Sequence, residues 1–219
     1  MKPAIVAVGG FSSNSGKTTL VCELLRALPG WEAIKMTRGH YRSCGRDPHA
    51  CCVSPLLGDE PLVLSGRGAT YAAGKDTGRY WEAGASNVHW VVSTDAQVAQ
   101  GFAAALGRVR SEGVLVEGNS FLRHADADFT LMVARADRPQ IKPTARRVLS
   151  KASALYLSQL DDGLDPGAVE NFLRELKVGE AAGGPAAIET VYTRDSFPQL
   201  VERIKAAQGV GAGRMRRAV

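Results

Sequence analysis

The stretch 4-AIVAVGGFSSNSGKTTLVCELLRAL-28 decides the fold of this chain. Residues 4–8 are a short apolar run of the kind that forms a buried strand. Residues 16–28 carry apolar side chains at helical spacing, which predicts a helix. The glycine- and serine-rich segment between them therefore joins a strand to a helix, and this is the context in which phosphate-binding loops form.

The segment from Gly10 to Thr18 has the residue types of a phosphate loop, but five residues separate its two outer glycines instead of the usual four. Its backbone N–H groups can form a nest for an anion, and the start of the helix adds the positive end of its dipole. Lys17 is expected to reach the β- and γ-phosphates and to neutralise developing charge, and Thr18 to bind Mg²⁺ through its hydroxyl. A chance Gly/Ser-rich turn is the plain alternative. The predicted nucleotide-binding residues are Gly10, Ser13, Asn14, Ser15, Gly16, Lys17, Thr18 and Thr19.

Two carboxylates are candidates to complete the site. Glu117 follows the apolar run of a strand at 113–118, where it could hold Mg²⁺ with Thr18, either directly or through water. Asp76 could position an attacking water as a catalytic residue, or it could simply cap a helix. Lys75 and Arg79 beside it are more simply read as solvated charges than as phosphate contacts.

The rest of the chain alternates strands with helices. This alternation predicts a three-layer α/β fold with a mainly parallel sheet and helices on both faces, and ligands bind at the carboxyl ends of such strands. We expect one domain over 1–207, an irregular cysteine-containing insertion at about 37–86, and a flexible basic tail over 208–219. Further strands are predicted at 32–36, 87–93, 113–118, 129–134, 154–158 and 187–193, and further helices from 94 or 95, and at 142–152, 165–176 and 196–207.

Four potential metal ligands lie within the irregular segment: Cys44, His49, Cys51 and Cys52. They could bind Zn²⁺, Ni²⁺ or an Fe–S centre, although the spacing matches no standard zinc finger and incidental thiols are the alternative. Cys22, on the first helix, is expected in the core.

Composition restricts the class of protein. With 45% hydrophobic and 22% charged residues, the chain has the make-up of an ordinary water-soluble domain. Neither a membrane-spanning run nor a signal peptide is recognisable, so a cytoplasmic protein without a membrane partner is expected. The net charge of +5 is partly due to arginines in the tail, which are too few to predict a nucleic-acid partner. Arg146 and Arg147 could approach a nucleotide, but capping a helix is the simpler interpretation.

Two families share motifs with this sequence. Residues 10–18, GFSSNSGKT, resemble the loop G-T-x-S-x-x-G-K-[ST] of dethiobiotin synthetase and the cobyrinic acid amidating enzymes, with Phe11 in place of the threonine. This spacing implies the SIMIBI class of P-loop proteins. The VEG at 116–118 and the GKDTGRYWEAGA at 74–85 resemble segments of the molybdopterin-guanine dinucleotide biosynthesis adaptor family, MobB. The likeness covers roughly the first 120 residues.

The second resemblance implies a Mg²⁺-dependent protein that binds and hydrolyses GTP, or alternatively ATP, in molybdenum-cofactor biosynthesis. It also implies a homodimer that meets molybdopterin or a molybdenum-cofactor enzyme, with hydrolysis that can be slow without the partner. Two other functions stay open: a metal-insertion GTPase that uses the Cys/His segment, and an ATP-dependent ligase or kinase acting on a small carboxylate. A nucleotide-sensing adaptor without enzymatic activity is a further alternative.

Overall fold

The computed structural model of the chain describes residues 2–39, 54–135, 137, 140–158, 174 and 190–214, with Ser54 and the last six of these described by their backbone alone. The proposed ligands Cys44, His49, Cys51 and Cys52 lie outside the described residues. So does nearly all of the helix predicted at 165–176.

The described residues form one eight-stranded sheet with the order β3-β4-β2-β5-β1-β6-β7-β8. β1 lies inside the sheet, parallel to β5 on one side and to β6 on the other. All described pairings are parallel except that of β3 with β4. The strands are β1 Ala4–Gly10, β2 Glu32–Arg38, β3 Leu62–Ser65, β4 Val88–Ser93, β5 Gly113–Glu117, β6 Phe129–Arg135, β7 Ala154–Ser158 and β8 Val191–Tyr192.

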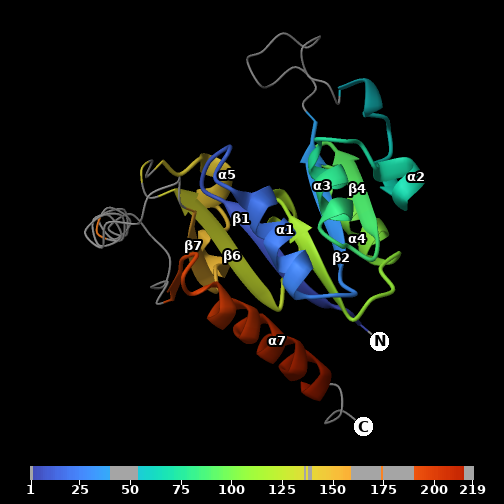
Figure 1. Cartoon of the computed structure of the whole chain (residues 1–219). Coiled ribbons are helices and arrows are strands. Elements are labelled where there is room, and N and C mark those ends of the chain that lie inside the picture. Colours follow the sequence, from blue (N-terminus) through green and yellow to red (C-terminus); the bar gives the residue numbers. More distant parts are fainter. Residues whose placement is uncertain are drawn as a thin grey trace.

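Helices cover both faces of this sheet, so the predicted three-layer fold is confirmed (Figure 1). One face carries α1 (Lys17–Ala27), α3 (Asp76–Glu82) and α7 (Phe197–Arg214). The other carries α4 (Val98–Leu106), α5 (Pro143–Arg146) and the 3₁₀ turns Ser120–Arg123 and Leu149–Lys151. Two short elements, the 3₁₀ turn Ser54–Leu56 and the helix α2 (Arg67–Thr70), precede α3.

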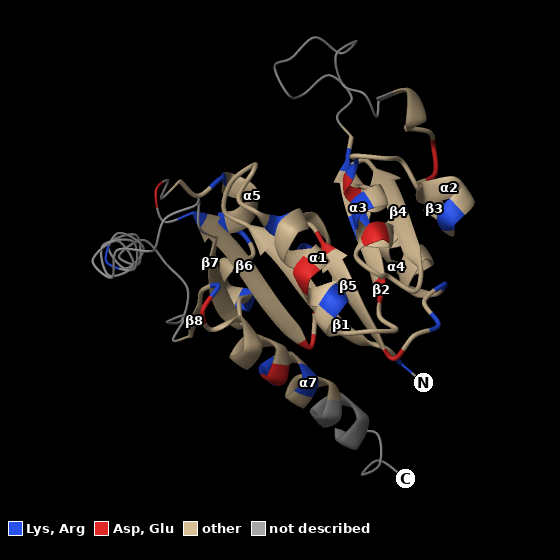
Figure 2. Cartoon of the chain, in the orientation of Figure 1, with Lys and Arg blue, Asp and Glu red and all other residues tan. Residues whose placement is uncertain are grey.

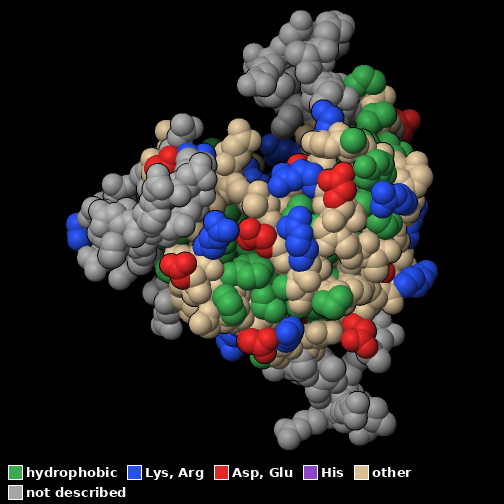
Figure 3. Space-filling view, viewed as in Figure 1, with side chains coloured by type: hydrophobic (Ala, Val, Ile, Leu, Met, Phe, Trp, Pro, Cys, Tyr) green, Lys and Arg blue, Asp and Glu red, His purple; other side chains and the backbone are tan. Residues whose placement is uncertain are grey.

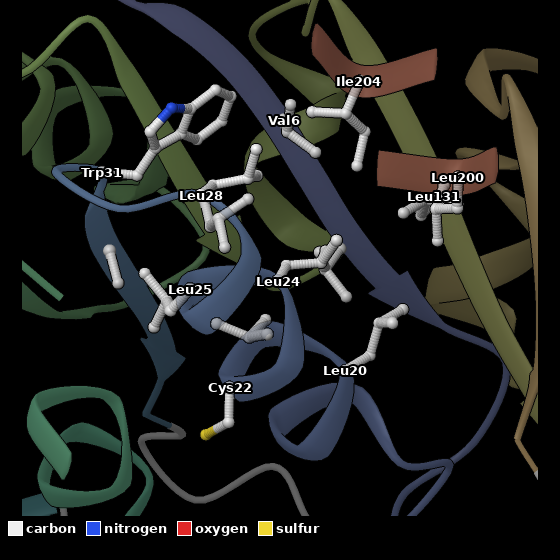
Figure 4. Close-up of a cluster of buried hydrophobic side chains, with 14 of the residues drawn as sticks. Val6, Leu20, Cys22, Leu24, Leu25, Leu28, Trp31, Leu131, Leu200 and Ile204 are labelled. Atoms are coloured by element: carbon white, nitrogen blue, oxygen red, sulfur yellow. The ribbon is translucent and has the colours of Figure 1, made fainter. Parts of the chain in front are cut away.

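Successive side chains of a strand point to opposite faces of the sheet, so the core is divided into two layers. Along β1, Val6 and Val8 point to the α1 side, and Ile5 and Ala7 to the α4 side. Figure 4 shows the first layer, in which leucines of α1 meet Val6 and side chains of α7 such as Ile204. Because β1 and α1 are both held in this layer, the loop that joins them has fixed ends.

The segment at 37–86 is more regular than the sequence predicted, because it contains β3, α2 and α3. α3 includes Gly78, a poor helix former, and this obscured the helix in the sequence. A Cβ at Gly78 would lie 2.0 Å from the carbonyl oxygen of Ala72, so the glycine permits a close backbone approach. The helix expected at 142–152 is divided into α5 and a 3₁₀ turn, and α7 continues to Arg214, into the segment expected as a tail.

A buried polar network joins β2, β3 and β4 at the end of the sheet away from the loop. Glu32 bonds to His89 Nε2 at 2.7 Å, and His89 Nδ1 bonds to the Ser65 hydroxyl at 2.8 Å. The other carboxylate oxygen of Glu32 accepts the backbone N–H groups of Arg110 and Ser111. Burial alone would raise the pKa of Glu32, but these hydrogen bonds outweigh it and hold the pKa below its ordinary value.

We predict that Glu32→Gln makes the folded state less stable and less sensitive to acid. Because the folded pKa is depressed, the carboxylate stabilises the fold above its ordinary pKa of 4.5, and this contribution is lost as pH falls through the folded value. Near neutral pH, the free energy of unfolding of the variant should be about 1–3 kcal/mol lower than that of the wild type. On acidification, the free energy of unfolding should fall less in the variant than in the wild type. Urea unfolding near pH 7 and near pH 4 measures both the loss of stability and its dependence on pH. Glu112→Gln, an exposed change at the same end of the sheet, is the control. Parallel pH profiles of wild type and Glu32→Gln would contradict the prediction.

Candidate functional site

The loop between β1 and α1 is fastened to the sheet at its first two residues. The side chain of Asn119 accepts the Gly10 N–H at 2.8 Å and donates to the Gly10 carbonyl at 2.9 Å. The Phe11 N–H donates to the carbonyl of Val133, and the Phe11 carbonyl accepts the N–H of Lys142. The ring of Phe11, 1% exposed, belongs to the core on the α4 side. Phe11 therefore anchors the loop from below and does not block it.

Two left-handed residues shape the loop, Asn14 with φ of 58° and Gly16 with φ of 86°. Gly16 caps α1 without a side-chain hydrogen bond, so the first-turn N–H groups of α1 are available for an anion. A Cβ at Gly10 would lie 2.5 Å from the Ser15 hydroxyl oxygen and 2.7 Å from a carbon of the Lys17 side chain. Both glycines are thus required by the geometry of the loop.

A cavity of about 440 Å³ opens on this loop. Every predicted nucleotide-binding residue from Ser13 to Thr19 lines it, whereas Gly10 lies behind the loop and sets its shape. Figure 3 shows positively and negatively charged side chains next to one another in the upper middle of the visible face, near α1 and α3. The other lining residues are Lys35, Asp76, Arg79, Glu117 and Lys142.

The carboxylate of Glu117, 3% exposed, is the centre of the polar groups in this cavity. It accepts hydrogen bonds from the Thr18 hydroxyl at 2.9 Å, from Lys35 Nζ at 2.6 Å and from the Tyr80 hydroxyl. Lys35 Nζ also lies 2.5 Å from Asp76 and so bridges the two carboxylates. Glu117 and Asp76, both predicted from the sequence, are therefore brought together with Thr18 by one lysine that was not predicted.

The charges of this cluster stabilise one another. Burial alone would lower the pKa of Lys35, but Glu117 and Asp76 outweigh it and raise the pKa overall. For Asp76, burial alone would raise the pKa, but Lys35 and Thr18 outweigh it and hold the pKa below its ordinary value. Lys35 is thus a cation and Asp76 an anion at neutral pH.

α3 delivers three polar side chains to the site. Asp76 begins the helix, and Arg79 and Tyr80, three and four residues later, lie on the same side of it. Arg79 donates to the Thr19 hydroxyl at 3.2 Å, so it belongs to the site, and its interpretation as a merely solvated charge is wrong. Burial raises the pKa of Tyr80 well above 10, which keeps its hydroxyl protonated as a donor. On the same helix, Trp81 Nε1 donates to the Thr70 hydroxyl at 2.9 Å.

Lys17 extends from the start of α1 over the loop. Its Nζ lies 3.3 Å from the Ser12 carbonyl oxygen and 3.4 Å from the Ser15 hydroxyl oxygen. Burial lowers its pKa to about 8, with Glu117 opposing the shift. Neither contact is a salt bridge, so the ammonium remains free to neutralise a phosphate.

The donor set fits Mg²⁺. The Thr18 hydroxyl and the carboxylates of Glu117 and Asp76 are hard oxygen ligands, which Mg²⁺ prefers. Lys35 lies between the carboxylates, so a metal ion would have to compete with its ammonium. Among the residues that the structure describes, no three His, Cys, Asp or Glu side chains gather as a further metal site. Cys22 is buried on α1, as predicted, and burial raises the pKa of its thiol.

Comparisons with known proteins give only distant structural likenesses. Neither a protein-family model nor a curated protein sequence matches the chain. Among solved structures, the chain is similar to the "apo" form of LpxK from Aquifex aeolicus in complex with ATP, with 16% sequence identity and a TM-score of 0.44. The match covers 88% of this chain and 71% of that one. No helix within the described ranges is long and apolar enough to span a bilayer. At this level of similarity, function has to follow from the site itself.

We predict that Asn119→Ala loosens the loop and destabilises the fold. The change leaves the buried N–H and carbonyl of Gly10 without their partner, which costs about 1–3 kcal/mol for each group left unpaired. Asn119→Asp keeps an acceptor for the N–H but offers the carbonyl no donor, so its stability should be no higher than the wild type's. Urea unfolding tests this, with Asn87→Ala as the control for the loss of one local hydrogen bond, since among the described residues the Asn87 side chain accepts only the N–H of Val88. If Asn119→Ala were no less stable than Asn87→Ala, the anchoring role would be overturned.

Proposed function

We propose that this chain binds a nucleoside triphosphate with Mg²⁺ at the loop from Gly10 to Thr19 and promotes reaction of its γ-phosphate. The observation that carries the proposal is the hydrogen bond from Thr18 to Glu117, residues 99 positions apart in the chain. It joins the first turn of α1 to the carboxyl end of the neighbouring strand β5, beside Lys17. This is the arrangement that a Mg²⁺-bound triphosphate requires.

Several residues of the cavity have distinct tasks in the proposed function. The free N–H groups of α1 and the Lys17 ammonium neutralise the β- and γ-phosphates. Thr18, Glu117 and Asp76 hold the metal, which when bound neutralises charge on the phosphate oxygens. Asp76 is 41% exposed at the mouth of the cavity, where it orients the attacking water or acceptor. Arg79, bonded to Thr19, lies within reach of the same phosphates.

A GTP-dependent role in molybdenum-cofactor assembly is the more specific form of this proposal. Residues of the MobB-like segments, Asp76 and Glu117, share the Lys35 ammonium, and this convergence supports a common use of the two segments. The resemblance to the MobB family also suggests that the protein acts as a homodimer together with a partner enzyme. Metal insertion depends on Cys44, His49, Cys51 and Cys52, which lie outside the described residues. The remaining alternative, a ligase or kinase acting on a small carboxylate, is favoured by a second cavity beside the loop, which Arg135, Lys142 and Arg146 line.

We predict that Lys17→Ala weakens nucleotide binding about tenfold or more, because it removes charge-assisted hydrogen bonds to phosphate. In the wild type, Lys17 loses its proton above about pH 8, so affinity should be constant below this value and fall above it, by up to about tenfold per pH unit. The decline should be absent in Lys17→Ala. Calorimetric titration of GTP and ATP between about pH 6 and pH 9.5 measures both effects. Equal affinities of the two proteins would remove the basis of the proposed function.

We predict that Lys35→Met increases the affinity for Mg²⁺ in the absence of nucleotide, about tenfold, because the ammonium no longer competes for Glu117 and Asp76. Without metal the variant should be less stable, since both carboxylates lose the ammonium that pairs with them, and Mg²⁺ should restore its stability. Titration calorimetry with Mg²⁺ and melting curves with and without the ion provide the readouts. Lys75→Met, which removes an exposed cation next to Asp76, is the matched control. Unchanged metal affinity in Lys35→Met would show that the carboxylates do not bind the ion.

A further inference from the structure

A second and larger cavity, of about 720 Å³, lies on the other side of the phosphate loop. It is bordered by α5 and by the end of β6, near which Figure 2 shows several Lys and Arg residues. Its wall is formed by Ser12, Ser13, Asn14, Arg135, Gln140, Ile141, Lys142 and Arg146. None of the roles assigned above to the first cavity uses Arg135, Gln140 or Arg146.

The charge in this cavity has one sign. Arg135, Lys142 and Arg146 are cations, and no carboxylate is among the lining residues. Arg135 is partly neutralised by the exposed Asp137, with a shortest contact of 2.6 Å. Within the described part of the chain, no carboxylate lies at ion-pair distance from Lys142 or Arg146. Unneutralised cations around a hollow raise the local concentration of anions.

The positive charge of Lys142 is disfavoured by its surroundings. Burial lowers the pKa of its ammonium, and the nearby cations Arg38 and Lys35 lower it further, against the opposing effect of Glu117. Its backbone N–H is fixed to the Phe11 carbonyl at 2.8 Å, so the residue cannot easily leave the loop. An anion bound here would relieve the repulsion among these cations.

The two cavities meet at the phosphate loop. Ser13, Asn14 and Lys142 line both of them. A molecule in the second cavity would therefore lie beside residues 12–14 of the loop, next to the cavity that Lys17 and Thr18 line. The nucleoside itself fits the described wall poorly, since among the residues that the structure describes there, none is aromatic and only Ile141 is large and apolar.

We infer that this second cavity binds the acidic co-substrate of the reaction, a small molecule recognised through a phosphate or carboxylate group. The inference rests on the proposed function, because it assigns the acceptor that the γ-phosphate would meet. Arg146 and Lys142 are the residues that recognise the acidic group. Arg146 is the specificity residue, since its guanidinium matches the two oxygens of either group, while Lys142 supplies a point charge shared with the nucleotide site.

The test compares Arg146→Gln with Arg147→Gln, a neighbouring exposed arginine that does not line the cavity. Both variants are made in the wild type and in Lys17→Ala, in which the first site is weakened. Binding of pyrophosphate, citrate and ATP or GTP is measured by calorimetry. We expect Arg146→Gln to weaken pyrophosphate or citrate binding about tenfold in the Lys17→Ala background and to change nucleotide affinity less than about twofold in the wild type. Arg147→Gln should change neither.

The outcomes separate this inference from the proposed function. Tighter binding of pyrophosphate than of citrate identifies a phosphate-bearing co-substrate, and the reverse order identifies a carboxylate; either supports the inference. If Arg146→Gln weakens nucleotide binding as much as it weakens probe binding, the cavity belongs to the nucleotide and the inference is overturned. Equal effects of the two arginine variants, or no binding of either probe, overturn it as well. A wild type that binds pyrophosphate or citrate through Arg146 but no nucleotide would instead refute the proposed function.

Discussion

The buried carboxylate of Glu117 is the constraint on which the site depends. A charge removed from water is costly unless other groups pair with it, and at 3% exposure Glu117 needs all three of its donors. These donors come from three separate elements: Thr18 from α1, Lys35 from β2 and Tyr80 from α3. The fold therefore cannot satisfy this carboxylate without also bringing the loop, the proposed metal ligands and α3 to one point.

The loop keeps its shape because its anchors are independent of any ligand. Asn119 holds both backbone groups of Gly10, and the ring of Phe11 is fixed in the core on the opposite face from α1. The position at which the related loop pattern has threonine thus serves here as a hydrophobic anchor. Farther along the loop, Asn14 adopts a left-handed conformation, with φ of 58°. An anion would meet donors that are already oriented, which limits the entropy lost on binding.

The sequence predicted those parts of the fold and site that local patterns encode. The strand, loop and helix over residues 4–28 and the carboxylate at the end of β5 follow from periodicity and residue type, and they agree with the structure. Lys35 and Lys142 could not be predicted in this way, since a single lysine in or after a strand carries no local signal. Their positions in the site arise from contacts with residues that are distant in the sequence. Tyr80 was missed for a related reason: its helix contains Gly78 and is stabilised by contacts that only the folded chain makes. The spacing of Asp76, Arg79 and Tyr80 on one helical face was the one signal that could have revealed it.

The position of Trp81 gives the protein a built-in optical reporter. Its indole N–H bonds to Thr70, and the guanidinium of Arg67 lies 5.8 Å from its ring, while the preceding residue in the chain is the tyrosine that bonds to Glu117. Any shift of α3 that follows rearrangement of the carboxylates changes the polarity around this indole. Its emission wavelength would then record occupancy of the cavity without an added dye, and the two other tryptophans, Trp31 against Gly113 and Trp90 bonded to Thr37, would supply a constant background.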